Sequence, residues 1–293
     1  MAVRRHIRGG RVPAPLTVMT LGAVLLLSAG CSGEGAVATA EPPTAGPAGP
    51  ARPGRAAVVA AADELARAGT ARVRTAMDMV SGHTRVTIEG SGAFDLAART
   101  GRLRVTLPPG TDGALPGERR QVRELIAPGA LYMRNRAGVP ADKWVRVDTT
   151  GLPDGNLVTG GATDPVTAAQ LLRGAHRVAY EGVTELGGTR VWHYSGLVDI
   201  ERAAAGAPPR ARRQLRAAEK GFSGHTVPFD AYLDAQARLR KVRHRFDFAA
   251  GPGSPPDADY TVTSTTELHA FGTRVRIRMP EPGDIWTGRI AAP

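Results

Sequence analysis

Two stretches of strict two-residue alternation constrain the fold of this 293-residue chain most. In residues 86–96 the even positions are apolar or glycine and most odd positions are polar, and residues 103–107 alternate again. A period of two places one kind of side chain on each face of a β-strand. The turn at residues 99–101 between the two stretches therefore predicts an antiparallel hairpin with one dry face.

Segments of similar character, separated by glycine and proline turns, continue through the chain. Strands are predicted at 122–126, 131–134, 144–147, 177–185, 189–198, 226–233, 239–248, 259–271 and 274–277. Helices are predicted at 56–68, 165–173 and 209–220, the second with Asp164 as its N-cap and the last two entered through proline. Runs of consecutive strands with few helices favour an α+β fold with a large curved antiparallel sheet.

The N-terminal 30 residues have the three-part pattern of a secretory signal peptide. A start rich in arginine and free of acidic residues precedes an apolar run at 16–29, which ends in small residues before Cys31. The run is shorter than the ~20 residues that a membrane-spanning helix needs. Residues 31–55 are rich in proline, glycine and alanine, which predicts a disordered tether before a single domain at 56–293.

The position of Cys31, the only cysteine, resembles the lipobox of bacterial lipoproteins. That resemblance implies that Cys31 carries acyl chains, such as palmitate, and anchors the protein to the outer face of the cytoplasmic membrane. Two or three chains hold a protein on a membrane much longer than one does. Ser28 departs from the commonest lipobox, which has leucine there. The other interpretation is an ordinary secretory signal followed by a chance cysteine.

The mature chain is basic. Removing residues 1–30 takes away four of the 38 Lys and Arg and none of the 27 Asp and Glu. Outside the cytoplasm, this charge favours anionic lipid headgroups or wall polymers over nucleic acid. The helix at 209–220 is either a solvated cover of the sheet or a contact surface for anionic lipid or a protein partner. The candidate contact residues are Arg210, Arg212, Arg213, Arg216 and Lys220.

No pattern of catalytic or metal-binding residues accompanies these segments. The seven histidines never pair at metal-ligand spacing, and no second cysteine is present. The chain has no Gly-x-Ser-x-Gly elbow, no phosphate-binding loop and no dinucleotide fingerprint. We therefore expect a protein that is not an enzyme and that needs no metal or cofactor.

In the order and character of its segments the chain resembles the actinobacterial lipid-carrier lipoproteins of the LppX/LprG type, within the LolA-like group. The likeness is carried by Cys31 with its tether, the helix from Ala56 leading into 70–74, the hairpin 86–107, and the segments 131–133, 143–148, 227–241 and 271–277. It implies a half-barrel with helices on its concave side and an apolar cavity between them. Such proteins bind acyl chains of lipids or glycolipids and carry or present them at the cell envelope.

The dry face of the predicted hairpin supplies the candidate cavity-lining residues. These are Val86, Ile88, Phe94, Leu96, Leu103, Val105 and Leu107. In a carrier they line an open cavity. In the alternative function, an interaction or sensor lipoprotein that binds an envelope protein through its surface, they form a filled core. Gly90 and Gly92 on the same face suggest a bend, a close approach or room for an acyl chain, and the loop 108–117 is a candidate gate.

Overall fold

The computed structural model describes most of the region predicted as one domain. The described residues are 54–109, 119–152, 154–158, 164–222, 224–248 and 259–288, all of them within one unit of the chain, residues 47–293. The signal peptide, Cys31, the tether up to residue 53 and most of the candidate gate lie outside the described residues. The first helix begins at Arg55, the last residue predicted for the tether.

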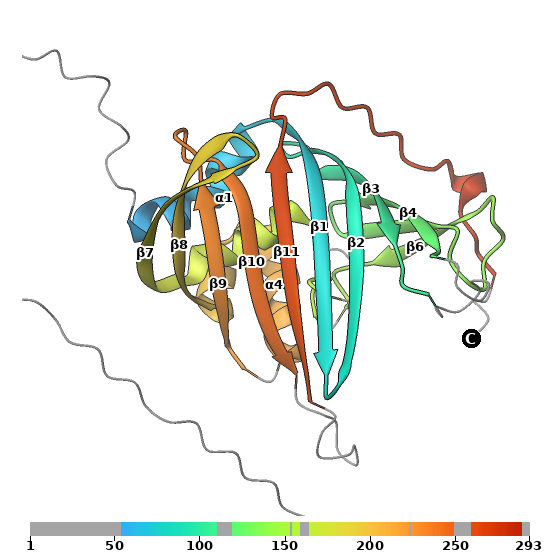
Figure 1. Ribbon diagram of the computed structural model, residues 1–293. Coiled ribbons are helices and arrows are strands. Elements are labelled where there is room, and N and C mark those ends of the chain that lie inside the picture. The colour runs from blue at the N-terminus through green and yellow to red at the C-terminus, as the bar shows by residue number, and fades with distance from the viewer. Residues whose placement is uncertain are drawn as a thin grey trace, which may run out of the picture. The chain divides into compact units, whose positions relative to one another are not determined.

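Eleven antiparallel strands form one curved sheet in the order β6-β5-β4-β3-β2-β1-β11-β10-β9-β8-β7 (Figure 1). The strands are β1 (Thr70–Ser81), β2 (Thr84–Asp95), β3 (Thr100–Thr106), β4 (Gln121–Ala127), β5 (Ala130–Arg134), β6 (Trp144–Asp148), β7 (Ala175–Leu186), β8 (Thr189–Asp199), β9 (Thr226–Leu233), β10 (Leu239–Phe248) and β11 (Tyr260–His269). Because β6 and β7 lie at opposite edges, the described sheet is an open half-barrel, which confirms the expected fold class.

The first and last strands meet at the centre of the sheet. From β1 to β6 each strand pairs with the next strand in the sequence, and the same is true from β7 to β11. Strands β1 and β11 then pair along their length, from Arg72 opposite His269 to Ser81 opposite Tyr260. The two halves of the chain therefore share one continuous concave face.

Four helices lie on the concave side, behind the sheet in Figure 1. They are α1 (Arg55–Arg67), α2 (Pro165–Leu171), α3 (Ile200–Gly206) and α4 (Pro209–Gly221), with a 3₁₀ turn, η1 (Leu172–Gly174), after α2. The helices pack mainly against one another and against η1, and α1, α2 and α3 contact the sheet at β7–β10. In α4 the buried side chains recur at helical spacing, at Ala211, Leu215 and Ala218. The expected N-cap of α2 is confirmed, because the Val166 N–H donates to Asp164 Oδ1 over 2.9 Å.

Three elements differ from the sequence-based expectation. Strand β1 was expected only as the segment after α1, since its inward positions include Ala71 and Thr75, which give a weak apolar signal. Helix α3 is too short, at seven residues, to show a helical period. The strand predicted at 274–277 is wrong, because this segment has no strand pairing in the structure. Alternation indicates an extended backbone, but a strand also needs a neighbour to pair with.

The two inward-facing glycines of β2 mark close approaches. A Cβ added to Gly90 would lie 2.4 Å from Thr75 Oγ1, and one added to Gly92 would lie 1.9 Å from the carbonyl oxygen of Arg102. The close-approach interpretation is therefore confirmed. The idea that these glycines leave room for an acyl chain is wrong, because neighbouring atoms of the protein already fill that space.

Candidate functional site

The concave face of β1–β6 is lined by apolar side chains at alternate positions. All seven residues predicted for the cavity belong to the hydrophobic cluster of this face or pack against it. The register sets them opposite other residues of the same face: Phe94 lies opposite Ala71, and Leu103 lies opposite Gly92. Sequence periodicity thus placed these side chains on the correct face. Whether they line a cavity stays a prediction.

Burial of this face changes from one end of the strands to the other. At the end next to α1, Ala71, Phe94 and Leu96 are completely buried. At the opposite end Val86 and Leu107 are only partly buried, and so is Met79, which lies directly opposite Val86. The apolar face is therefore closed at one end and partly exposed at the other.

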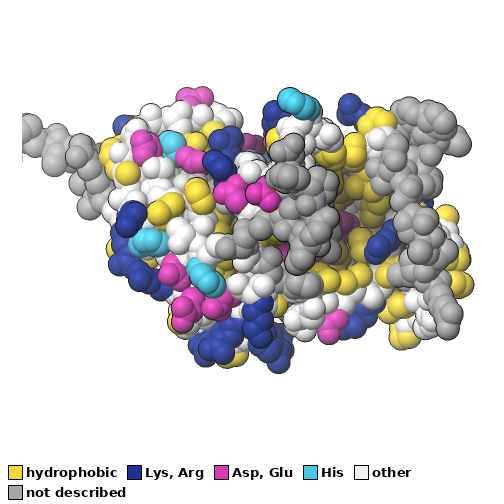
Figure 2. Space-filling view, turned by 90° about the horizontal axis from the view of Figure 1, so that it is seen from below, with side chains coloured by type: hydrophobic (Ala, Val, Ile, Leu, Met, Phe, Trp, Pro, Cys, Tyr) yellow, Lys and Arg dark blue, Asp and Glu magenta, His cyan; other side chains and the backbone are white. Residues whose placement is uncertain are grey.

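Aromatic side chains border the partly exposed end. Phe248 at the end of β10 stacks on Tyr260 at the start of β11, with ring centroids 4.5 Å apart. Phe222, directly after α4, contacts Phe248 at 5.0 Å and Phe246 at 4.9 Å. Figure 2, which looks toward this end of the strands, shows hydrophobic side chains gathered along a hollow. We call this end, with its partly exposed residues Met79, Val86 and Leu107, the mouth.

One carboxyl group interrupts the apolar lining. Glu124 of β4 lies opposite Leu103 on one side and Met133 on the other, and only 2 % of it is exposed. Its Oε2 has no hydrogen-bond partner in the described part of the chain. Burial raises the pKa of Glu124 to about 8, because ionisation away from water is unfavourable. At neutral pH the group is thus mainly a neutral acid whose O–H can donate a hydrogen bond.

A second polar group is buried on the same face nearer the centre of the sheet. His244 of β10 lies opposite Ser264 of β11, and burial lowers the pKa of the imidazole to about 3, so the ring is neutral. Its Nε2 lacks a hydrogen-bond partner within the described ranges. The same is true there of the hydroxyls of Thr75 and Thr266, which lie directly opposite each other. Such groups reduce stability, since each loses its bonds to water on burial.

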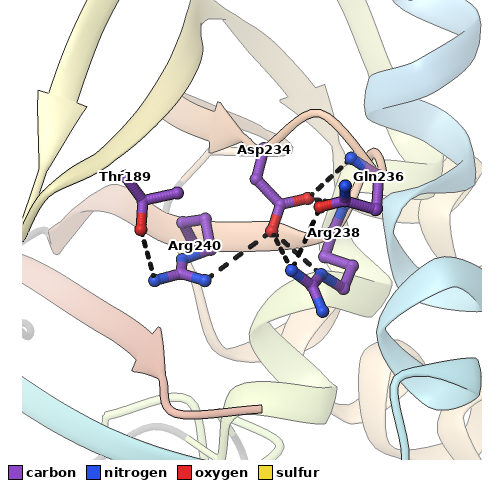
Figure 3. Close-up of polar contacts among 5 residues, drawn as sticks. All are labelled: Thr189, Asp234, Gln236, Arg238 and Arg240. Carbon is purple, nitrogen blue, oxygen red and sulfur yellow. Dashed lines mark hydrogen bonds and ion pairs between the residues drawn. The ribbon is translucent and has the colours of Figure 1, made fainter.

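A cluster of buried and half-buried polar groups lies at the turn between β9 and β10 (Figure 3). The carboxylate of Asp234, 2 % exposed, accepts hydrogen bonds from the backbone N–H groups of Gln236 and Arg238, each over 3.0 Å. Arg238 Nε donates to Asp234 Oδ2 over 2.9 Å, and Arg240 approaches the same oxygen at 3.7 Å.

This cluster stabilises the turn, since its charged groups bind one another. Arg240 also donates to Thr189 Oγ1 over 3.2 Å, which ties the turn to β8. Both guanidinium groups lie over the ring of Phe271, at 4.6 Å for Arg238 and 5.2 Å for Arg240. With its partners supplied from within the protein, the Asp234 carboxylate serves the fold and not a ligand.

The five cations predicted on the third helix are all exposed on α4. Arg210 and Arg213 line a cleft of about 260 Å³ together with Arg99 and Thr150. Arg212 donates to the carbonyl oxygen of Ala207 over 3.1 Å. The structure therefore brings two of the five into one cleft. A contact with lipid or a partner through these cations stays a prediction.

The described residues contain no group of three or more His, Cys, Asp or Glu that could hold a metal ion. Within the same ranges no helix is long and apolar enough to cross a membrane. The buried groups Glu124 and His244 were missed by the sequence analysis. A signal for Glu124 was present, because it occupies an inward position of the alternation Val122, Glu124, Ile126.

Comparison with known proteins yields similarities of fold only. No protein-family model and no curated protein sequence matches the chain. Among solved structures, LprF from Mycobacterium bovis matches with a TM-score of 0.43 at 10% identity, over 77% of this chain and 96% of that one. The lipoprotein LppX from Mycobacterium tuberculosis matches with a TM-score of 0.39 at 12% identity, over 76% and 99% of the two chains. A LolA superfamily protein from Nitrosomonas europaea matches with a TM-score of 0.32 at 10% identity, over 74% and 94%.

Proposed function

We propose that this chain is a membrane-anchored lipoprotein that binds the acyl chains of a lipid or glycolipid on its concave face and carries or presents them at the cell envelope. No chemical step is part of the proposal. The observation that supports it is the apolar face, which is fully buried beside α1 and partly exposed at the mouth. A chain entering there would contact Val86, Ile88, Val105 and Leu107.

Removal of acyl chains from water would supply the affinity. Each buried CH₂ contributes about 0.8 kcal/mol, and an apolar wall discriminates weakly between chains of similar length. The polar headgroup would stay in water at the mouth. The neutral carboxyl of Glu124 offers the wall a hydrogen-bond donor for an ester or hydroxyl oxygen of the ligand. Broad selectivity among acyl chains follows from this arrangement.

A surface-acting interaction or sensor lipoprotein is the second candidate function. It is favoured by the complete burial of Phe94 and Leu96, which is the packing of a filled core. It is also favoured by the five exposed cations of α4, which suit an acidic envelope protein. This function requires no apolar ligand, so ligand content separates the two candidates.

Ligand binding is tested by narrowing the mouth. Val86→Trp places a bulky ring at the mouth with Met79 and Leu107 and should reduce bound lipid at least about tenfold, a loss of about 1.4 kcal/mol or more in binding free energy. The measurement is native mass spectrometry of the full chain purified from its own membrane, with transfer of fluorescent lipid between vesicles as the second readout. The matched control is Val183→Trp on β7, where the valine is already 44% exposed.

Loss of bound lipid in Val86→Trp but not in Val183→Trp would support the carrier function. Absence of copurifying lipid and of transfer in the wild-type protein would refute it and leave the surface-acting function.

The membrane anchor is tested separately with Cys31→Ser. The variant lacks the thiol to which the diacylglyceryl group would be attached, so we expect it in the soluble fraction, without added acyl mass and with an unchanged circular dichroism spectrum. Two or three acyl chains hold a protein on a membrane far longer than the remaining contacts would. A variant that still sediments with membranes and still carries acyl mass would contradict the anchor at Cys31.

A further inference from the structure

The outer face of the sheet, opposite the concave face, carries an arginine-lined groove of about 900 Å³. Its floor contains five exposed arginines at alternate positions of three strands: Arg72 and Arg74 of β1, Arg102 and Arg104 of β3, and Arg123 of β4. Alternate residues of a strand share one face, so all five side chains leave the sheet on the same side. The small side chain of Ser91, between Arg74 and Arg104, leaves the floor open between them.

The C-terminal segment forms one wall of this groove. After β11 the chain is held at the start of β1, where the Gly272 N–H donates to the Thr70 carbonyl over 2.8 Å. It is held again at the start of β6, where the Trp286 N–H donates to the Trp144 carbonyl over 2.7 Å. Figure 1 shows this segment running from the end of β11 to the η2 turn (Pro282–Asp284) beside β6. We call residues 272–286 the strap; its Arg276 and Arg278 also line the groove.

The lining of the groove is strongly positive, and its nearest carboxylates lie beside it: Glu89 and Glu267 line the adjacent pocket, and Glu267, opposite Arg74, forms an ion pair with Lys241. Seven arginines and His269 line the groove, and no Asp or Glu does. None of the seven arginines forms an ion pair within the described residues. Arg104 lies directly opposite Arg123, a like-charge pair that destabilises a sheet. Burial, with Arg74 and Arg240 nearby, lowers the pKa of His269. A bound anion would relieve this repulsion.

The shape of the groove restricts the kind of anion. The strap, fixed at two points, forms a wall beside the floor arginines, so a flat bilayer would meet this wall before it reached them. An extended peptide would find few backbone partners there, because β1, β2 and β3 are inner strands whose N–H and C=O groups bind their neighbours. Arginine side chains two residues apart on a strand are separated by roughly 6.6–6.8 Å, a spacing that suits charges repeated along a chain.

We propose that this groove binds a linear polymer whose repeating anionic groups are phosphates. Guanidinium groups match phosphate oxygens with two parallel hydrogen bonds, which favours phosphate as the repeating group. Binding would hold the anchored protein beside a phosphate-bearing envelope polymer and leave the concave face free. The site is independent of the proposed lipid binding, since the two lie on opposite faces of the sheet.

The test uses the full chain in a non-ionic detergent and fluorescently labelled long-chain inorganic polyphosphate, with binding followed by fluorescence anisotropy. The groove variant is Arg74→Gln/Arg104→Gln/Arg123→Gln. We expect its affinity to fall at least about tenfold, and the slope of log K against log salt between about 50 and about 200 mM to decrease by about 2, as three lost phosphate contacts require. The control, Arg177→Gln/Arg190→Gln/Arg202→Gln on β7, β8 and α3, removes the same charge from exposed positions away from the groove and should bind like the wild type.

Three results would overturn the proposal. Equal loss of affinity in the two triple variants would show that net charge alone attracts polyphosphate. Competition by polyglutamate as effective as that by unlabelled polyphosphate would assign the groove to acidic polypeptides. Binding to vesicles of phosphatidylglycerol that is lost only in the groove variant, without polyphosphate binding, would assign it to the bilayer. Thermal unfolding of both variants confirms that each is folded under the binding conditions.

Discussion

At pH 8 the Glu124→Gln variant is expected to be more stable than the wild-type protein by several kcal/mol, whereas near pH 4.5 the two should differ little. Glu124 has an ordinary pKa of 4.5 in the unfolded chain and a pKa of about 8 when buried. Its folded form therefore retains a proton that the unfolded form has lost. Each pKa unit corresponds to about 1.4 kcal/mol, so this difference costs the wild-type fold at most about 5 kcal/mol at pH 8.

Glu124 and His244 change the pH dependence of stability in opposite directions. Stability due to the protonated Glu124 is complete below pH 4.5 and is lost as the pH rises toward 8. His244 has a pKa of about 3 in the fold against 6.5 when unfolded, so its stability is complete above 6.5 and is lost as the pH falls toward 3. Between pH 4.5 and 6.5 the fall in stability with pH due to Glu124 cancels the rise due to His244. We therefore expect these two groups to give a stability maximum in that window.

Urea unfolding at pH 4.5, 5.5, 6.5 and 8 measures these differences. The wild-type free energy of unfolding should fall by about 1 kcal/mol from pH 6.5 to 8, because the loss of about 1.6 kcal/mol from Glu124 exceeds the gain of about 0.4 kcal/mol from His244. Glu124→Gln should abolish that fall. The control is Glu185→Gln on the exposed hairpin between β7 and β8, which should follow the wild-type profile. A Glu124→Gln profile parallel to the wild type would mean that the carboxyl is ionised inside the fold.

Asp234→Ala is expected to lower the free energy of unfolding by about 3 kcal/mol. Removing one partner of a buried ion pair leaves the other charge uncompensated, which costs about 3–5 kcal/mol when both are buried. The lower end of this range applies because both arginines are partly in contact with water: the side chain of Arg238 is 30% exposed and that of Arg240 is 12% exposed. The backbone N–H groups of Gln236 and Arg238 also lose their acceptor.

The matched control for Asp234 is Asp247→Ala, which removes an ion pair with Arg245 in which both side chains are more than half exposed. Exposed pairs contribute little, so this change should cost no more than about 1 kcal/mol. Chemical denaturation at one pH compares the two variants. Equal losses would show that the turn between β9 and β10 does not depend on its buried carboxylate.

Much of the architecture was predictable because local periodicity carries it. The alternation of residues 86–107 gave the β2–β3 hairpin and its dry face, and Pro165 and Pro209 gave the starts of two helices. Segments with small inward residues were harder to recognise. The inward positions of β1 are occupied in part by Ala71 and Thr75, and helix α3 is shorter than the two turns that a period requires. Residues 274–277 alternate like a strand, yet no neighbour pairs with them.

The proposed sites depend on residues that are far apart in the sequence. Alternating arginines are visible in the sequence at 72 and 74, at 102 and 104, and at 276 and 278. The arginines of the strands converge through the pairing of β1 with β2 and of β2 with β3. Those of the strap join them because β11 pairs with β1 and the strap is held at Thr70 and Trp144. The mouth likewise arises only because Met79, Val86 and Leu107 come to the same end of the half-barrel.

The sequence alone determined the face that each side chain takes, since the period of a strand or helix is a local property of the backbone. It thereby assigned Val86, Ile88, Phe94, Leu96, Leu103, Val105 and Leu107 to the dry side of the hairpin and Arg104, between Leu103 and Val105, to the other side. Only the tertiary structure decided which of these side chains are exposed, which charges lie together and which carboxyl is buried. Exposure, pKa and electrostatic repulsion depend on distances between strands, and those distances are set by the assembled sheet.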